Sequence, residues 1–367
     1  MKVLILSCNT GGGHNSAAHA VEEVVKAHGD EAVVLDYLCL AGQKVSHAVG
    51  NTYIQLVKKA PLLFGLVYKI GLFVSKHISR SPVYYANSKM VKYLKAYLKE
   101  HPTDVIVMPH LYPAETLTYM KRHNIPLPPT VVVMTDYTCI PFWEETDCDY
   151  YVVPDPALMD SIVKRGLPKE KLLPFGIPVS QRFYQPISKE EARKELHLDP
   201  SLPYILVAGG SMGAGNLLCF TKELARSCKK EHIIVIAGTN KSSRQKLQKT
   251  FSESNTVTIL GYTDQMPLYL RACDLVFTKP GGLTSTEAAV CGTPIVHTRP
   301  IPGCETENRH FFVQNGMSIS ALTPTLQIKK GLKLLRHPDR AHQMTLCQQE
   351  HIHQDAAEKL YQFLKTL

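Results

Sequence analysis

The chain has 367 residues, of which 44% are hydrophobic and 20% are charged. This length exceeds one ordinary domain and predicts two, each able to bury a full core, and the composition excludes a disordered or membrane-spanning chain. The net charge of +9 is concentrated: ten Lys or Arg and no Asp or Glu lie between Tyr37 and Lys99, which implies an anionic partner, either phospholipid or nucleic acid.

Cysteine usage and the N-terminus indicate the compartment. Ten cysteines are spread singly, with no CxxC pair and no histidine at zinc-finger spacing, which argues against a disulfide framework or a structural metal. The apolar run that precedes the glycines at 11–13 is too short for a signal peptide. We therefore expect a cytoplasmic protein.

Strands and helices alternate along the first half. A buried strand is predicted at Lys2 to Ser7, followed by glycines and a helix from His14 to about Ala27. Further apolar, β-branched runs predict strands at Ala32 to Leu35, Asp104 to Met108, Val131 to Met134 and Tyr151 to Val153. This alternation is typical of a parallel, doubly wound sheet.

The pattern breaks around Gly176 and Pro186 and then repeats. Strands are predicted at Ile205 to Ala208, Ile233 to Ala237, Val257 to Leu260, Leu275 to Thr278 and Ile295 to His297, and from about His337 the chain predicts one or two surface helices. We expect an α/β protein of two Rossmann-like domains facing a cleft, residues 1–185 and 186–367, with the terminal helices able to cross back to the first.

Three glycine-rich turns follow predicted strands. They lie at 11–13, 209–213 and 280–284. Glycine lets the backbone approach an anion closely, and a helix N-terminus favours negative charge, although each turn alone could serve only a tight strand-to-helix connection. If these turns bind a phosphate-bearing ligand such as a nucleotide sugar, the residues expected to contact it are Gly12, Gly13, Gly210, Ser211, Gly281, Gly282, Leu283 and Thr284.

None of the three turns has the P-loop pattern, and the first lacks the spacing of a dinucleotide fingerprint. No acidic DxD-type cluster stands near them. These turns therefore favour a nucleotide sugar held by backbone dipoles, with no metal and no cofactor beyond the donor itself.

Two long motifs, SCNTGGGHNSAA at 7–18 and KPGGLTSTEAAVCGTPIVHTRPIPGCETENRHFF at 279–312, resemble those of the diacylglycerol glycosyltransferases and monogalactosyldiacylglycerol synthases. These enzymes group with the N-acetylglucosaminyl transferase that makes the lipid-linked peptidoglycan precursor. The resemblance covers most of the chain, including TDY at 135–137 and PFGIPV at 174–179. It implies a GT-B fold and an inverting transfer of glucose or galactose from a UDP-sugar to diacylglycerol or a similar lipid.

His14 is the candidate general base. An imidazole at this helix start, at the edge where open α/β sheets bind ligands, can take a proton from an acceptor hydroxyl, although such a histidine can equally cap or pack. The resemblance implies the catalytic role, with Asp136 orienting or complementing His14. The resemblance also implies that Glu287 contacts the ribose of the donor. The alternative is that its carboxylate only complements the positive end of the dipole of its own helix.

The PGCETEN segment supplies Glu305, Glu307 and Asn308 as candidate readers of the hexose hydroxyls. Related enzymes often carry Gln where this chain has Cys304, so the sequence does not decide whether the transferred hexose is glucose or galactose. The number of sugars added and the oligomeric state also stay open.

The basic segment contains a 14-residue apolar stretch, 61–74, short of the roughly 20 residues that span a bilayer. We expect it to enter one leaflet while lysines meet anionic headgroups, which makes the protein peripheral on the inner face of the cell membrane. A buried helix with a solvated basic face is the alternative, and no motif supports nucleic acid. The residues expected to engage membrane or acceptor are Lys58, Lys59, Phe64, Tyr68, Lys69 and Phe73.

Three other functions compete with this one. A UDP-sugar 2-epimerase shares the paired α/β architecture but gives no reason for the basic and apolar segment. A non-catalytic sugar-nucleotide sensor would dispense with His14. An N-acetylglucosaminyl transferase acting on a polyprenyl-linked acceptor stays within the transferase class.

Overall fold

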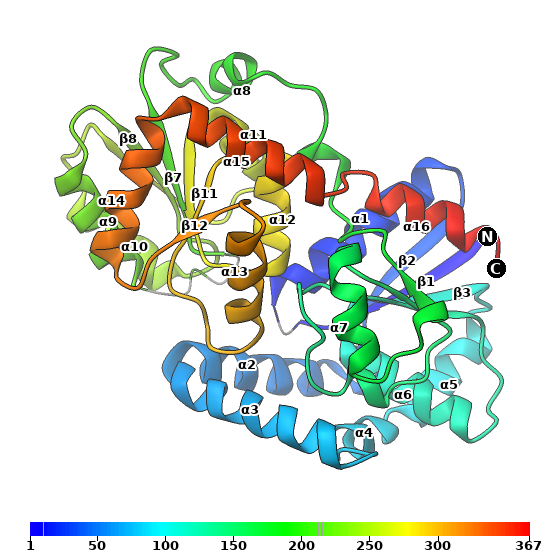
Figure 1. The fold of residues 1–367 in the computed structure, drawn as a ribbon. Coiled ribbons are helices and arrows are strands. Elements are labelled where there is room, and N and C mark those ends of the chain that lie inside the picture. Colours follow the sequence, from blue (N-terminus) through cyan, green and yellow to red (C-terminus); the bar gives the residue numbers. More distant parts are fainter. Residues whose placement is uncertain (10, 211–212, 214–215) are drawn as a thin grey trace. The chain divides into compact units, whose positions relative to one another are not determined.

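The computed structural model describes residues 1–9, 11–210, 213 and 216–367, without the side chains of Lys58 and Lys59. The chain divides into two units (Figure 1). The first comprises 1–181, 302–304 and 353–367, and the second comprises 182–301 and 305–352. The expected boundary at 185/186 lies close to the start of the second unit.

The first unit is built on a parallel six-stranded sheet in the order β2-β1-β3-β4-β5-β6. Its strands are β1 (Lys2–Ser7), β2 (Glu31–Asp36), β3 (Val105–Met108), β4 (Thr130–Val133), β5 (Tyr150–Val152) and β6 (Leu172–Leu173). The predicted doubly wound α/β class and five strands are confirmed, whereas β6 is too short to give a periodic signal. Because the strand order reverses between β1 and β3, ligands are expected beyond the carboxyl ends of these two strands.

Both faces of this sheet are buried, because alternate side chains of each strand point to opposite sides. Leu4 and Ile106 belong to one hydrophobic cluster, and Ile5 and Val107 belong to another on the other face. The second cluster includes residues of the C-terminal helix: Ala357, Leu360, Tyr361 and Leu364.

That helix, α16 (Ala356–Leu364), belongs to the first unit, whereas the preceding α15 (Pro338–His351) is mostly exposed, so the expected surface position holds for α15 but not for the packed face of α16. Its apolar residues recur every three or four positions, the spacing of one helix face, and that face packs into the core of the first unit. The other helices of this unit are α1 (Gly12–Ala27), η1 (Tyr37–Ala41), α2 (Gln43–Lys59), α3 (Pro61–His77), α4 (Pro82–Ser88), α5 (Val91–Glu100), α6 (Leu111–Arg122), η2 (Trp143–Glu145), η3 (Pro156–Leu158), α7 (Met159–Lys164) and η4 (Lys169–Lys171). A 3₁₀ turn, η5 (Gln181–Phe183), leads into the second unit.

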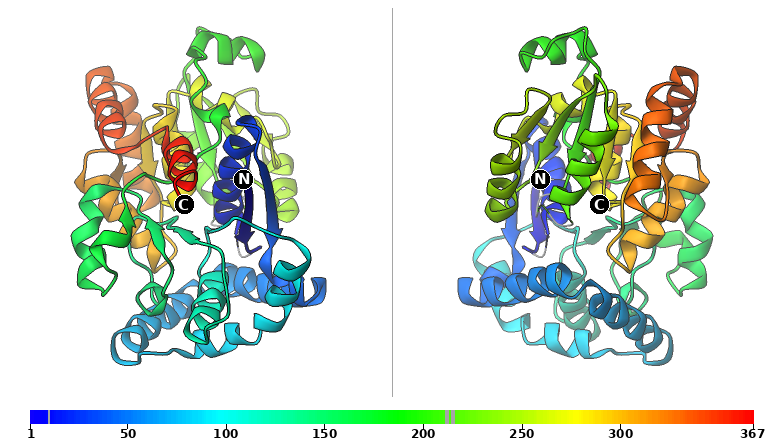
Figure 2. Two further views of the ribbon diagram at one scale, coloured as in Figure 1. Left: turned by 90° about the vertical axis from the view of Figure 1, so that its right-hand side faces the viewer. Right: turned by 90° about the vertical axis from the view of Figure 1, so that its left-hand side faces the viewer.

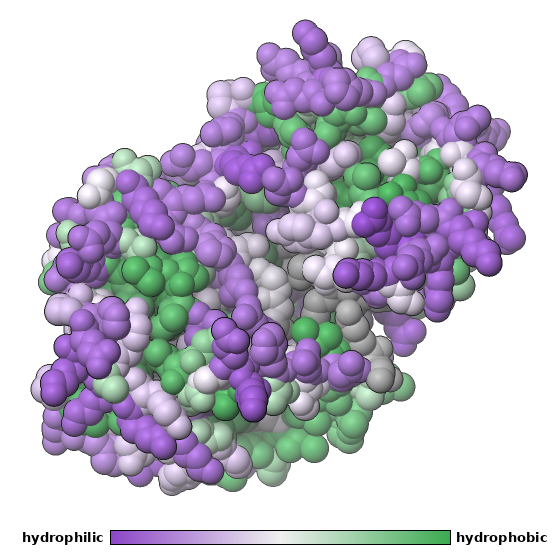
Figure 3. Space-filling view, turned by 180° about the vertical axis from the view of Figure 1, so that it is seen from behind, coloured by the Kyte–Doolittle hydropathy of each residue, from purple (hydrophilic) through white to green (hydrophobic). Residues whose placement is uncertain are grey.

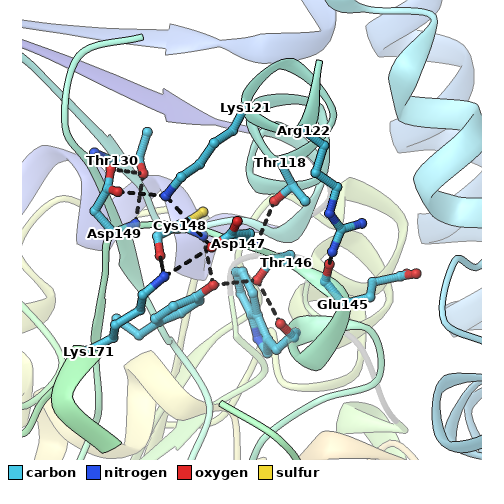
Figure 4. Close-up of polar contacts among 12 residues, drawn as sticks. Thr118, Lys121, Arg122, Thr130, Glu145, Thr146, Asp147, Cys148, Asp149 and Lys171 are labelled. Atoms are coloured by element: carbon cyan, nitrogen blue, oxygen red, sulfur yellow. Dashed lines mark hydrogen bonds and ion pairs between the residues drawn. The ribbon is translucent and has the colours of Figure 1, made fainter. Parts of the chain in front are cut away.

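A polar network fixes the amino ends of β4 and β5 (Figure 4). Asp149 accepts hydrogen bonds from the Thr130 backbone N–H at 2.9 Å and from the Thr130 hydroxyl at 2.7 Å. Lys121 Nζ lies 2.7 Å from Asp149 Oδ1, and Lys171 Nζ lies 3.0 Å from Asp147 Oδ1. This end of the sheet is therefore occupied by ion pairs, opposite to the edge that carries the candidate site.

The second unit contains another parallel six-stranded sheet, ordered β12-β11-β10-β7-β8-β9. Its strands are β7 (Tyr204–Ala208), β8 (His232–Ile236), β9 (Val257–Leu260), β10 (Leu275–Thr278), β11 (Ile295–His297) and β12 (Ile319–Ser320). When the strands of this unit are numbered 1 to 6 from β7 to β12 and the sheet is read from β9, the order is 3-2-1-4-5-6. This is the strand order of dinucleotide-binding folds. All five predicted strands are confirmed, the two-residue β12 was not predicted, and the order reverses between β7 and β10.

Four helices bury apolar side chains in the cluster that contains Ile205, Val235 and Phe277: α9 (Leu217–Ser227), α10 (Lys241–Thr250), α14 (Pro324–Leu335) and α15 (Pro338–His351). The unit also contains α8 (Lys189–Glu195), α11 (Met266–Ala272), α12 (Gly282–Val290) and α13 (Cys304–Gln314).

Candidate active site

His14 lies in the first turn of α1, directly after the glycine loop that follows β1. Its Nδ1 lies 2.8 Å from the carbonyl oxygen of Pro109 and 3.0 Å from the Thr135 hydroxyl. A carbonyl can only accept a hydrogen bond, so Nδ1 carries the proton and the neutral ring keeps its basic lone pair on Nε2. The contact thereby selects the tautomer that a general base requires.

Three adjacent strands place these residues together. His14 follows β1, Pro109 follows β3, and Thr135 and Asp136 follow β4. Because β1, β3 and β4 are parallel neighbours, their carboxyl ends meet at one edge of the sheet, at its strand-order reversal. The structure therefore brings the predicted pair His14 and Asp136 to the same edge.

Burial lowers the pKa of His14 below its ordinary value, whereas the Asp136 carboxylate and the Pro109 carbonyl oppose this effect. A lowered pKa keeps the imidazole neutral at neutral pH. Asp136 stabilises the protonated ring electrostatically, which is the charge state that proton transfer would create.

Sequence reasoning missed His110. Its ring lies edge-on to that of His14, with centroids 4.6 Å apart. Its Nδ1 accepts a hydrogen bond of 3.2 Å from the Tyr112 backbone N–H, and burial together with His14 lowers its pKa well below the ordinary value. His110 is therefore a neutral neighbour of the candidate base, and its place two residues after the end of β3 was the signal that could have revealed it.

Side-chain hydrogen bonds hold the glycine loop that precedes His14. Asn15 Nδ2 donates to Asn9 Oδ1 at 2.8 Å, and Asn9 Nδ2 donates to Asp36 Oδ2 at 2.7 Å. Gly12 and Gly13 open α1, whose first turn has neither a side-chain cap nor an acidic residue. The N-terminus of α1 thus keeps its positive dipole end, which suits an anion.

The second unit places two glycine turns after β7 and β10, the strands at its own reversal point. Gly281 caps α12 and Gly282 begins it, again with no side-chain cap and no acid in the first turn. The space beside Gly281 is open, so its backbone is accessible to a ligand. Leu283 is buried and Thr284 is half-buried.

The turn after β7 requires glycine. Gly210 and Gly213 have φ values of 68° and 54°, and a Cβ on Gly213 would lie 2.0 Å from the Ala237 carbonyl oxygen. Both positions favour glycine because L side chains rarely adopt these angles. The predicted diphosphate contact Ser211 lies outside the described residues.

Glu287 lies on α12, five residues after Gly282. Glu287 is half-buried, and burial raises the pKa of its carboxyl to about 8. A partly desolvated carboxyl so close to the glycine turn has the chemistry to bond a hydroxyl pair. Its contact with ribose stays a prediction.

The three candidate hexose readers differ in their surroundings. Glu305 pairs with Lys279 at 2.8 Å, and Asn308 Nδ2 donates to the Pro280 carbonyl oxygen at 3.1 Å. Glu307 is exposed. Glu305 and Asn308 therefore brace the turn between β10 and α12, and hexose recognition by all three stays a prediction.

An apolar stripe covers the outer face of α3. Its side chains are between 49% exposed (Val67) and 75% exposed (Leu62), and they are Leu62, Leu63, Leu66, Val67, Ile70 and Phe73. Lys69 and Lys76 are also exposed on this helix. Five members of the stripe were not singled out from the sequence, whereas the expected Phe64 and Tyr68 are half-buried and Phe64 packs edge-on against Tyr53.

Helices α2 and α3 run side by side (Figure 2), and apolar side chains gather along the lower edge of Figure 3, where these helices lie. The inner side of α3 is polar near its C-terminal end, where Ser75 Oγ donates a hydrogen bond to Glu144 Oε1 at 2.5 Å.

Among the described helices none alone has the length and apolar composition to cross a bilayer, although α3 and α4, bent by 88°, meet that criterion together.

Residues 14–179 match the family model described as Monogalactosyldiacylglycerol (MGDG) synthase, and residues 204–360 match the Glycosyltransferase family 28 C-terminal domain. MurG of Acinetobacter baumannii shares the fold, with a TM-score of 0.63 at 14% identity, covering 100% of this chain and 99% of that one. The UDP-GlcNAc 2-epimerase of Neisseria meningitidis does so too, with a TM-score of 0.60 at 12% identity and 100% of both chains covered. The matches and the two sheets define a glycosyltransferase with the GT-B fold.

The chain is 30% identical over 352 residues to a processive diacylglycerol beta-glucosyltransferase of Staphylococcus saprophyticus, covering 94% of this chain and 87% of that protein. It is 26% identical over 348 residues to the Bacillus subtilis protein of the same name, covering 94% and 89%. The chain therefore belongs to the diacylglycerol glycosyltransferase family.

Replacing Asp136 with Asn tests the electrostatic role of this carboxylate. Without its charge the pKa of His14 falls further, so the acid limb of kcat/KM moves to lower pH while the plateau drops by roughly tenfold because the base is weaker. A pH profile of initial rates measures both effects. Asp160→Asn, which alters an exposed acid on α7, is the control, and an unmoved acid limb in Asp136→Asn would contradict the assignment.

Proposed function

We propose that this chain is an inverting glycosyltransferase that moves a hexose from a UDP-sugar to diacylglycerol or a similar lipid at a membrane surface. The observation that carries the proposal is the neutral imidazole of His14, with Nδ1 held by Pro109 and Nε2 available as a base. The names of the relatives favour glucose over galactose as the hexose and diacylglycerol as the acceptor.

In the proposed step the lipid hydroxyl oxygen attacks the anomeric carbon while its proton passes to Nε2 of His14. The bond between that carbon and the diphosphate oxygen breaks, its electron pair leaves with UDP, and the configuration inverts. The first unit supplies the base, stabilised as imidazolium by Asp136. The second supplies the glycine turns, whose amides and helix N-termini oppose the charge that builds on UDP.

The 2-epimerase alternative shares the fold, but the apolar stripe on α3 has no role in that reaction. A sugar-nucleotide sensor has no use for a base with a selected tautomer. Family membership and these two features favour lipid glycosylation.

Mass spectrometry of the lipids formed in liposomes with UDP-glucose or UDP-galactose tests the activity. We expect hexosylated diacylglycerol from the wild-type chain and a loss of about 10² to 10⁴ in kcat for His14→Ala, because general-base catalysis contributes that much. UDP affinity should change little in the variant. A new epimer formed without acceptor, or normal turnover by His14→Ala, would contradict the proposal.

The metal-free part of the proposal has its own test. We expect turnover of the purified protein to survive an excess of EDTA, because the charge on the leaving diphosphate is assigned to backbone amides and helix dipoles. Rates are compared with and without EDTA, and restoration by Mg²⁺ or Mn²⁺ is the control. Activity that disappears with EDTA and returns with either ion would overturn this part.

The apolar stripe and the neighbouring basic residues support peripheral attachment to an anionic leaflet on the cytoplasmic side. Leu66 and Phe73 are 53% and 64% exposed, so burying the rest of each side chain among acyl chains would be favourable by about 1–2 kcal/mol. Exposed lysines beside them would meet phospholipid headgroups.

Leu66→Asp and Phe73→Asp test this attachment by vesicle flotation. We expect each to lower binding to anionic vesicles by tenfold or more, since a burial term is lost and a repelled charge is added. Affinity for UDP should be retained. Leu322→Asp, a change at an exposed leucine of the second unit, is the matched control, and equal flotation of all variants would rule out the stripe.

A further inference from the structure

Lys279 adjoins both glycine turns of the second unit. It directly follows β10 and opens the turn to α12. Its Cε lies 3.9 Å from the position that a Cβ on Gly210 would occupy, so the lysine stem lies beside the turn after β7. The cation therefore lies where the strand order reverses, at the turns expected to hold a diphosphate.

In the structure this cation is paired with a carboxylate. Lys279 Nζ lies 2.8 Å from Glu305 Oε1, and the two side chains are only 15% and 11% exposed. Breaking such a shielded pair normally leaves a charge uncompensated, which is strongly unfavourable. The pair can therefore open only if each partner has a second source of stabilisation.

Glu305 has one. Its Oε2 accepts a hydrogen bond of 2.7 Å from the Ile301 backbone N–H, and the residue lies in the first turn of α13. Both the N–H group and the helix dipole favour its negative charge. Glu305 thus stays stabilised when the lysine turns away, whereas Lys279 needs a new anion.

We propose that Lys279 exchanges Glu305 for the diphosphate of the UDP-sugar when the donor binds, and there opposes the charge that builds on the leaving UDP. This inference rests on the proposed function. An ammonium on a flexible four-carbon stem can make such a change of partner, and it adds a full positive charge to the partial charges of the glycine amides. Glu305 then acts as a holding partner for Lys279.

Calorimetric titration of UDP and of uridine separates this role from a structural one. We expect Lys279→Met to weaken UDP binding ten- to hundredfold and uridine binding less than twofold, because only UDP carries the diphosphate. Because Lys279→Met leaves Glu305 with only the Ile301 N–H and the helix N-terminus as partners, the double variant K279M/E305Q, which removes both charges, is measured beside it, and thermal unfolding checks that both variants are folded. The double variant should lose UDP affinity to a similar degree, whereas E305Q alone should bind UDP at least as tightly as the wild type.

Two results would overturn the inference. One is wild-type affinity for UDP in folded K279M/E305Q, and the other is an equal loss of UDP and uridine binding in both variants. Failure of the wild-type chain itself to bind UDP would instead overturn the proposed donor, so the two failures are distinguishable.

Discussion

The hydrogen bond between His14 Nδ1 and the Pro109 carbonyl joins the helix after β1 to the segment after β3. It decides which ring nitrogen carries the proton, and it exists only because parallel strands β1 and β3 end at the same edge. Asp136 and His110 act on the same imidazole, one by charge and the other by ring contact. The role proposed for His14 as a base therefore depends on strand order as much as on the histidine itself.

The second unit has the same α/β architecture as the first but presents different chemical groups at its strand-order reversal. Where the first sheet presents a titratable ring, the second presents backbone: Gly210, Gly213 and the uncapped start of α12. Its charged pair, Lys279 and Glu305, lies beside these turns, and one of its histidines, His297, is buried between Ser285 and Ser318 with a pKa lowered to about 3. The proposed anion-binding turns and the proposed base thus lie at the same kind of strand-order reversal.

Sequence patterns predicted the paired α/β folds because long β-branched runs and glycine turns are local signals. They missed β6 and β12, since two residues show no periodicity, and they missed His110, whose relation to His14 arises only when distant strands pair. On α3 the composition predicted an apolar helix but not which side faces water, because Phe64 turns inward and Leu66 outward through contacts with other segments. Site residues set by tertiary contacts were thus harder to predict than those set by motifs.

The packing of α16 has a consequence for synthesis. The strands of the first sheet emerge from the ribosome early, but one of their faces is closed by Ala357, Leu360 and Leu364, which are translated only after the second unit. Until then Ile5 and Val107 lack part of their apolar cover, and exposed surface of this kind is prone to aggregate or to engage chaperones. The first unit is therefore begun before the second but completed only after it, so the core against which the helix of His14 packs closes only once the second unit has been translated.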